Sequence, residues 1–296
     1  MQTIEAISTF RLLRWQAHNI AVFTGLSIAV VVAEELSGKL AGMLPQTPIT
    51  VLGAAIGIYC SFRTNSAYDR WWEGRRLWGQ LVNSSRHFTA QMLAYVHADK
   101  ARTLVLRHIL YVHALRCELR GEALMSDLDI ARVNKEFNAG EDPSRPSLCT
   151  RILRRQLSAL TELANGNQLD ARRLQSVDQT LSVLLDVQGG CERIRNTPFP
   201  PSYGRITELL IRTYAVLLPL AIIDDLEWWS IPISIVVCLS FKLISEVGAI
   251  LEDPFTQAWD ALPLHALSRT IERNLRDALG DHQPPAAEPD ARGVLL

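Results

Sequence analysis

The sequence has few of the features that mark a soluble enzyme or a nucleic-acid-binding protein. Its 296 residues carry 30 Lys and Arg against 31 Asp and Glu, so no basic excess is available to attract a nucleic acid. The five cysteines are far apart and form no Cys-x-x-Cys motif, which implies neither a zinc site nor a disulfide framework. No HExxH, Gly-x-Gly-x-x-Gly, GKS/GKT or Gly-x-Ser-x-Gly motif occurs. The sequence therefore predicts no enzyme, no nucleic-acid partner, no metal and no cofactor.

Long apolar runs dominate instead, at residues 15–33, 40–62, 206–223 and 228–251. A bilayer core of about 30 Å needs roughly 20 helical residues, which these runs approach or reach. The first run could be a cleavable signal peptide, but Glu34 and Glu35 stand where small residues would mark the cleavage site. The last two could be buried helices of a soluble protein, but the acidic linker 224–227, followed by Trp228 and Trp229, is typical of a membrane boundary. We therefore expect four transmembrane helices.

The third and fourth runs each contain one pair of opposite charges, Glu208 with Arg212 and Lys242 with Glu246. Both pairs are spaced i, i+4, so their charges can meet on one helix face. We interpret them as mutually satisfied pairs and not as a catalytic set.

The distribution of Lys and Arg predicts an orientation in the membrane. The loop between the first two runs holds only Lys39, and the linker 224–227 holds neither Lys nor Arg. Arginine is frequent at the other ends of the runs, at Arg11, Arg14, Arg63, Arg70, Arg75 and Arg76. The positive-inside rule then places both termini and residues 69–205 in the cytoplasm.

The interval 69–205 is expected to form a helical bundle. Apolar residues recur at helix-like spacing over 104–115, 151–164 and 169–187, and the breakers between them are 138–146, 165–167 and Gly189-Gly190. The predicted organisation is two transmembrane helices in 1–68, a cytoplasmic helical domain in 69–205, two transmembrane helices in 206–251, a cytoplasmic helical segment in 252–280 and a flexible tail in 281–296.

The most unusual run is FRTNSAYDRWWEGRRLWGQLVNSSR at 62–86, where the second apolar run ends. Its density of Arg and Trp exceeds what anchoring at a membrane boundary needs, and the helical pattern continues through it. Together with CERIRNTPFPPSY at 191–203 and LEDPF…DALPL at 251–264, it makes the chain resemble the bestrophin family in its bacterial branch. The motif residues that carry this resemblance are Arg70, Trp71, Trp72, Glu73, Trp78, Asn196, Pro198, Glu252, Asp253 and Pro254.

The resemblance implies an all-α integral membrane protein that assembles as a homopentamer, with the second transmembrane helix of each subunit lining a central pore. It implies an apolar neck formed by Ala54, Ile58 and Phe62, and a cytoplasmic aperture at Ile194. The three neck positions are spaced i, i+4, i+8 and so lie on one helical stripe. From spacing alone, helix packing or lipid contact would be the better interpretation of this stripe, and only the resemblance favours a pore neck. Ala54 is smaller than the family's usual residue and would widen the outer ring.

The function implied by the resemblance is a passive channel for monovalent ions, in which the apolar neck gates by excluding water. The permeating ion can be an anion such as chloride or a cation such as sodium. The acidic linker 224–227 slightly favours a cation. Calcium regulation is not expected, because Glu252, Asp253 and Asp260 are too few for the roughly six to eight oxygens that Ca²⁺ takes.

The expected partners are copies of the same chain, membrane lipid and the permeating ions. The expected location is a bacterial-type inner (plasma) membrane, crossed several times, with both termini cytoplasmic. The alternative is a membrane-anchored helical signalling or scaffold module, in which the spans only tether residues 69–205 and no pore exists.

Overall fold

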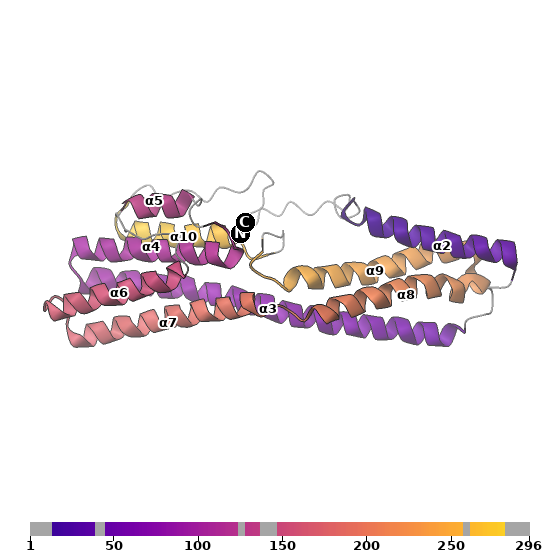
Figure 1. Ribbon diagram of the computed structural model, residues 1–296, viewed down its shortest axis with the longest axis horizontal. Coiled ribbons are helices and arrows are strands. Elements are labelled where there is room, and N and C mark those ends of the chain that lie inside the picture. The colour runs from indigo at the N-terminus through magenta and orange to yellow at the C-terminus, as the bar shows by residue number, and fades with distance from the viewer. Residues whose placement is uncertain (1–13, 39–44, 124–127, 137–146, 257–260, 282–296) are drawn as a thin grey trace. The chain divides into compact units, whose positions relative to one another are not determined.

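The computed structural model describes residues 14–38, 45–123, 128–136, 147–256 and 261–281, and the regular elements within these segments are all helices (Figure 1). They are α2 (Ala17–Ser37), α3 (Gln46–Tyr95), α4 (Ala98–Arg120), α5 (Leu128–Glu136), α6 (Leu148–Asn165), α7 (Ala171–Asn196), α8 (Pro201–Leu226), the short 3₁₀ helix η2 (Glu227–Trp229), α9 (Ser230–Leu251) and α10 (Leu264–Ala278). The all-α prediction is confirmed for this part of the chain.

The helices form two compact units. Residues 3–70 and 198–253 form one, here called the apolar unit, and residues 71–197 and 254–296 form most of the other, here called the bundle unit. Residues 198–205, which the sequence analysis assigned to the cytoplasmic interval, therefore group with the apolar helices. The reason is local: α7 ends at Asn196, and Pro201 occupies the first turn of α8, where a proline costs no hydrogen bond.

In the apolar unit, α2, α8 and α9 pack against one another and against the first half of α3 (Figure 1). Their shared core includes Phe23, Ile56, Ile211 and Tyr214. Two stretches of the described residues are long and apolar enough to cross a membrane, Ala17–Ser37 and Pro201–Leu251. The second has 51 residues, more than twice the roughly 20 that one crossing needs.

Most of this apolar surface is not covered by the chain itself. Only 17% of the most apolar window of Ala17–Ser37 and 22% of that of Pro201–Leu251 are buried. The expected run 40–62 begins in residues 39–44, which lie outside the described part, and its described portion is not apolar enough to be singled out as a span. This portion forms the start of α3.

Helix α3 continues without a break from the apolar unit into the bundle unit. Its 50 residues correspond to about 75 Å of helix, against about 30 Å for the hydrocarbon core of a bilayer. The expectation of a helix that runs on past the Arg- and Trp-rich motif is therefore confirmed.

In the bundle unit, α4 lies among α5, α6, α7 and α10 and is buried around almost its whole circumference (Figure 1). The predicted helices over 104–115, 151–164 and 169–187 correspond to parts of α4, α6 and α7, and the break at 165–167 is confirmed. The loop predicted at 138–146 and the tail from 282 lie outside the described residues. Gly189-Gly190 does not break α7. A Cβ on Gly190 would lie 2.9 Å from Leu77 Cδ2, so this glycine allows a close approach between helices.

Candidate functional site on helix α3

The outward face of α3 in the apolar unit carries the three predicted neck residues. Ala54 is exposed, Ile58 is 59% exposed and Phe62 is 68% exposed in the single chain. They follow one another at four-residue intervals and therefore form a continuous stripe along the helix. A stripe of large apolar side chains that the subunit itself leaves uncovered is available to line a path or to contact another chain.

The opposite face of α3 is packed closely onto α8 and α9. A Cβ on Gly53 would lie 2.6 Å from the hydroxyl of Tyr214, and one on Gly57 would lie 3.6 Å from Phe241. Ile56 and Cys60 on this face are each 1% exposed. Gly53 and Gly57 thus bring α3 against its neighbours, and this packing fixes which face of α3 points outward.

Immediately after Phe62, Arg63 enters this packed side and is 6% exposed. Its Nε donates to Glu252 Oε1 at 2.8 Å, its Nη2 lies 2.7 Å from the same oxygen, and its Nη1 donates to Ser245 Oγ at 3.0 Å. Glu252 thus pairs with a residue that is far away in the sequence.

The charged residues of α8 and α9 form a chain of contacts. Arg212 Nε donates to Glu208 at 2.8 Å, and Lys242 Nζ lies 3.5 Å from Glu246, so both predicted pairs are confirmed. Lys242 lies closer to Glu208, at 2.6 Å, and thereby joins α8 to α9. Gln16 donates to Glu246 and connects the chain of contacts to the start of α2.

The remaining motif residues lie mostly in the bundle unit, where they bring separate parts of the sequence together. Trp78 is fully buried, Trp71 and Arg70 are half-buried, and Trp72 is exposed. Glu73 accepts a hydrogen bond from Arg193 of α7. A Cβ on Gly74 would lie 3.2 Å from Pro254 and 3.3 Å from Phe255, which follow Glu252 and Asp253 in the chain. The motifs at 191–203 and 251–264 thus pack on α3, which carries the first motif.

The predicted aperture residue, Ile194, is 3% exposed in the single chain and belongs to the core of the bundle unit. Leu184, Val187, Cys191 and Ile194 recur at helical spacing and are all buried. This periodicity was available in the sequence and indicates a core face. Asn196 and Pro198, at the end of the same run, are exposed.

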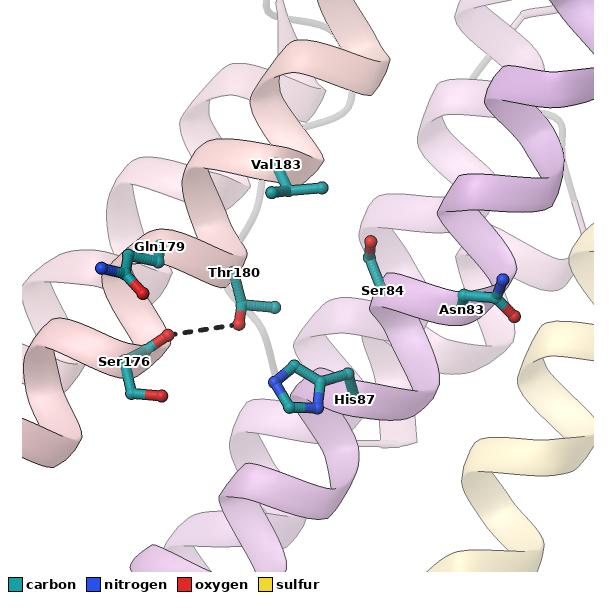
Figure 2. A pocket seen from close by; sticks show the side chains of 7 residues that line it. All are labelled: Asn83, Ser84, His87, Ser176, Gln179, Thr180 and Val183. Carbon is teal, nitrogen blue, oxygen red and sulfur yellow. Dashed lines mark hydrogen bonds between the residues drawn. The ribbon is translucent and has the colours of Figure 1, made fainter.

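A polar groove lies between α3 and α7 in the bundle unit, with a volume of about 390 Å³. Figure 2 shows its lining, which consists of Asn83, Ser84, His87, Ser176, Gln179, Thr180 and Val183. Thr180 Oγ1 donates to the carbonyl oxygen of Ser176 at 3.3 Å. The lining offers hydroxyl, amide and imidazole groups and includes no carboxylate. Its lining residues form no motif that would predict this groove from the sequence.

An ionic cluster joins α4, α5 and α10. Glu272 is fully buried and accepts from Arg132 at 2.8 Å and from Arg276 at 2.7 Å, and its Oε2 lies 2.9 Å from His113 Nε2. Burial alone would raise the pKa of Glu272, but the hydrogen bonds with His113 and Arg132 hold it well below its usual range. Asp129 has a similarly lowered pKa, because interactions with His265, His113 and Arg269 outweigh its burial.

The cluster and the rest of the described chain give no metal centre. Within the described ranges, no group of three or more His, Cys, Asp and Glu side chains could hold a metal ion. Of the three acids considered for calcium, Glu252 is paired with Arg63, and Asp260 lies outside the described residues.

Fold and site together define an all-helical membrane protein with an exposed apolar stripe on its longest helix. The family model for bacterial and fungal bestrophin proteins matches residues 6–277. The chain therefore belongs to the bestrophin family, as its motifs indicated. Bestrophins are ion channels and not enzymes.

Named relatives and solved structures agree with this assignment. The chain is 31% identical over 263 residues to a voltage-dependent anion channel-forming protein of Nostoc, covering 83% of this chain and 85% of the relative. It is 30% identical over 276 residues to a protein of the same description from Salmonella typhi, covering 91% and 89%. A bestrophin homologue of Klebsiella pneumoniae has a crystal structure that matches with a TM-score of 0.84 at 29% identity, covering 90% of this chain and 99% of that one.

Proposed function

We propose that the chain is a subunit of a passive anion channel, a homopentamer in which α3 of each subunit lines a central pore. The observation that carries this proposal is the exposure of Ile58 and Phe62, 59% and 68%, on a helix whose other face is fully packed. Membership of a channel family supports the same conclusion.

The neck consists of rings formed by Ala54, Ile58 and Phe62. Apolar rings of this kind resist wetting, so they form a barrier that ions cross only when the ring dilates or fills with water. Ala54 has the shortest side chain of the three and makes the widest ring. Copies of the chain around the pore would also cover part of the apolar surface that a single chain leaves exposed.

Chloride or a similar monovalent anion is the permeating ion that we propose. Two relatives described above carry the name of anion channels. A phenyl ring presents a positive edge, so a ring of Phe62 edges would favour an anion. The acidic linker, which slightly favours cations, lies at the far end of α8, where Asp225 accepts a hydrogen bond from Gln46.

For the topology, we propose that α2, the first half of α3, α8 and α9 cross a bacterial inner membrane and that both termini are cytoplasmic. The lengths of α2 and of Pro201–Leu251 support three of these four crossings directly. The crossing by α3 rests on its packing against α8 and α9 and on the arginines that follow Phe62.

The test is ion flux through purified protein in liposomes, with native mass spectrometry of the same preparation in detergent. Five copies and a chloride flux that exceeds the sodium flux support the proposal. A sodium flux that exceeds the chloride flux would overturn the proposal of an anion as the permeating ion, but not the proposal that the protein is a channel. A monomer or dimer without flux would indicate the tethered scaffold instead.

A further inference from the structure

We propose that the buried Arg63–Glu252 ion pair keeps the neck electrically neutral beside Phe62, so that neither of its two charges biases which ion passes. This inference rests on the proposed function, since it concerns the ion path that α3 lines. It assigns a role to two residues that lie outside the neck stripe itself.

The position of Arg63 is fixed by contacts on several sides. Its guanidinium contacts Glu252 at 2.7 and 2.8 Å and Ser245 at 3.0 Å, both near the end of α9. A Cβ on Gly204 would lie 3.3 Å from Arg63 Nη2, so the absence of a side chain at this position of α8 leaves room for the guanidinium. A fork of fixed donors held in this way loses little freedom when it pairs with a carboxylate.

The next residue, Thr64, repeats the arrangement. Its Oγ1 donates to the carbonyl oxygen of Ile244 at 3.4 Å, and a Cβ on Gly248 would lie 3.1 Å from Thr64 Oγ1. Residues 63 and 64 are therefore both held by α9, while Phe62 points away from it with 68% of its surface exposed. Because a rotation of α3 would break these contacts, they hold Phe62 at the inner end of the neck stripe.

The charges matter as well as the contacts. Arg63 is 6% exposed and the Glu252 side chain 23% exposed, so water screens neither of them fully. As a pair they are close to neutral for an ion in the neck. Removal of the Glu252 charge leaves Arg63, the residue next to Phe62, uncompensated. Removal of the Arg63 charge leaves Glu252 uncompensated, in contact with that same residue. An uncompensated Arg63 attracts anions, and an uncompensated Glu252 attracts cations.

The experiment measures the chloride-to-sodium permeability ratio from reversal potentials in a NaCl gradient across planar bilayers. Glu252→Gln keeps an oxygen that can accept from Arg63 and removes only the charge, so the ratio should rise. Arg63→Gln should lower it. A unit charge about 10 Å from an ion changes the permeability of that ion by roughly tenfold at the effective dielectric of a protein surface, and in opposite directions for chloride and sodium, so the ratio should shift by roughly a hundredfold. The double variant Arg63→Gln/Glu252→Gln should return close to the wild-type ratio.

The matched control is the pair of Glu208 and Lys242, which is as close at 2.6 Å but involves no residue of α3. Glu208→Gln should leave the ratio within about twofold of wild type, because the charges that it leaves, on Arg212 of α8 and Lys242 of α9, are not on the helix that lines the neck. If Arg63→Gln does not assemble, Glu252→Gln decides alone, since its hydrogen bond is preserved.

The inference is overturned if Glu252→Gln forms intact oligomers with an unchanged or lowered ratio, or if both single variants shift the ratio in the same direction. A wild-type protein that conducts no ions would instead overturn the proposed function. The two failures are therefore distinguishable in one set of recordings.

Discussion

At the scale of single residues, Ile58 and Phe62 are the side chains that test the neck most directly. Ile58→Ala shrinks an apolar ring and lowers the dewetting barrier, so single-channel conductance should rise. Phe62→Ala should also change ion selectivity, because it removes the phenyl edges. Ala54→Gly should have little effect, whereas Ala54→Phe should block the path.

The control for this series is Leu52, which is half-buried and packs against the core of the apolar unit. Leu52→Ala should reduce assembly, measured by size exclusion, more than it changes conductance. Unchanged conductance of Ile58→Ala in intact oligomers would mean that another helix lines the path or that there is no path.

The charged residues of α8 and α9 give a second prediction. An uncompensated charge in a membrane helix costs roughly 2.5–3.5 kcal/mol. From sequence spacing alone, Lys242 would lose its only partner in Glu246→Leu. In the structure Lys242 is closer to Glu208, so Glu208→Leu should destabilise the protein more than Glu246→Leu. Thermal denaturation in detergent measures this order, and a milder effect of Glu208→Leu would contradict it.

At the scale of whole elements, the sequence predicted most of the helices, because apolar periodicity reports directly which face of a helix is buried. It could not predict the pairing of Arg63 with Glu252, since nothing in local spacing relates residues so far apart. Ile194 shows two kinds of sequence argument that point to different surroundings. Its burial agrees with the spacing of Val187 and Cys191, but the resemblance assigned it to an aperture by alignment.

Gly190 shows why a glycine has two interpretations. In sequence it resembles a helix breaker, and in the fold it allows α7 to approach Leu77 of α3. Only the neighbouring helix, which the local sequence does not reveal, decides between the two. The same holds for Gly53, which admits the ring of Tyr214.

The helices of the bundle unit also predict a pH dependence. Burial lowers the pKa of His108 to about 3, so the folded state excludes a proton that the unfolded chain binds below about pH 6.5. Stability therefore falls as the pH drops through 6.5 towards 3. His108→Gln should flatten this part of a plot of melting temperature against pH, measured by tryptophan fluorescence.

The carboxylate of Glu272 affects the stability of the fold in a lower range of pH. Its pKa is depressed in the folded state, so its contribution is fully present above the unfolded value of about 4.5 and is lost as the pH falls below it. Glu272→Gln should lower the melting temperature at pH 7 and flatten the curve only below about pH 4.5. Equal flattening above pH 5 in this variant would show that His108 is not the group that titrates there.

At the scale of the whole molecule, topology is the property on which the remaining proposals depend. The arginines near the ends of the apolar helices and the lack of Lys and Arg in the linker 224–227 predict that His97 lies in the cytoplasm and Asp225 outside it. A cysteine introduced as Asp225→Cys should react with an impermeant maleimide in intact cells, and His97→Cys should react only after the cells are opened. Both positions are exposed, and the five native cysteines are buried, so the background should be low. Asp225→Cys loses one hydrogen bond, from Gln46, so an exposed neighbour, Asp224→Cys, serves as a second reporter. Labelling of His97→Cys in intact cells would reverse the orientation, and with it the assignment of Phe62 to the cytoplasmic end of the neck.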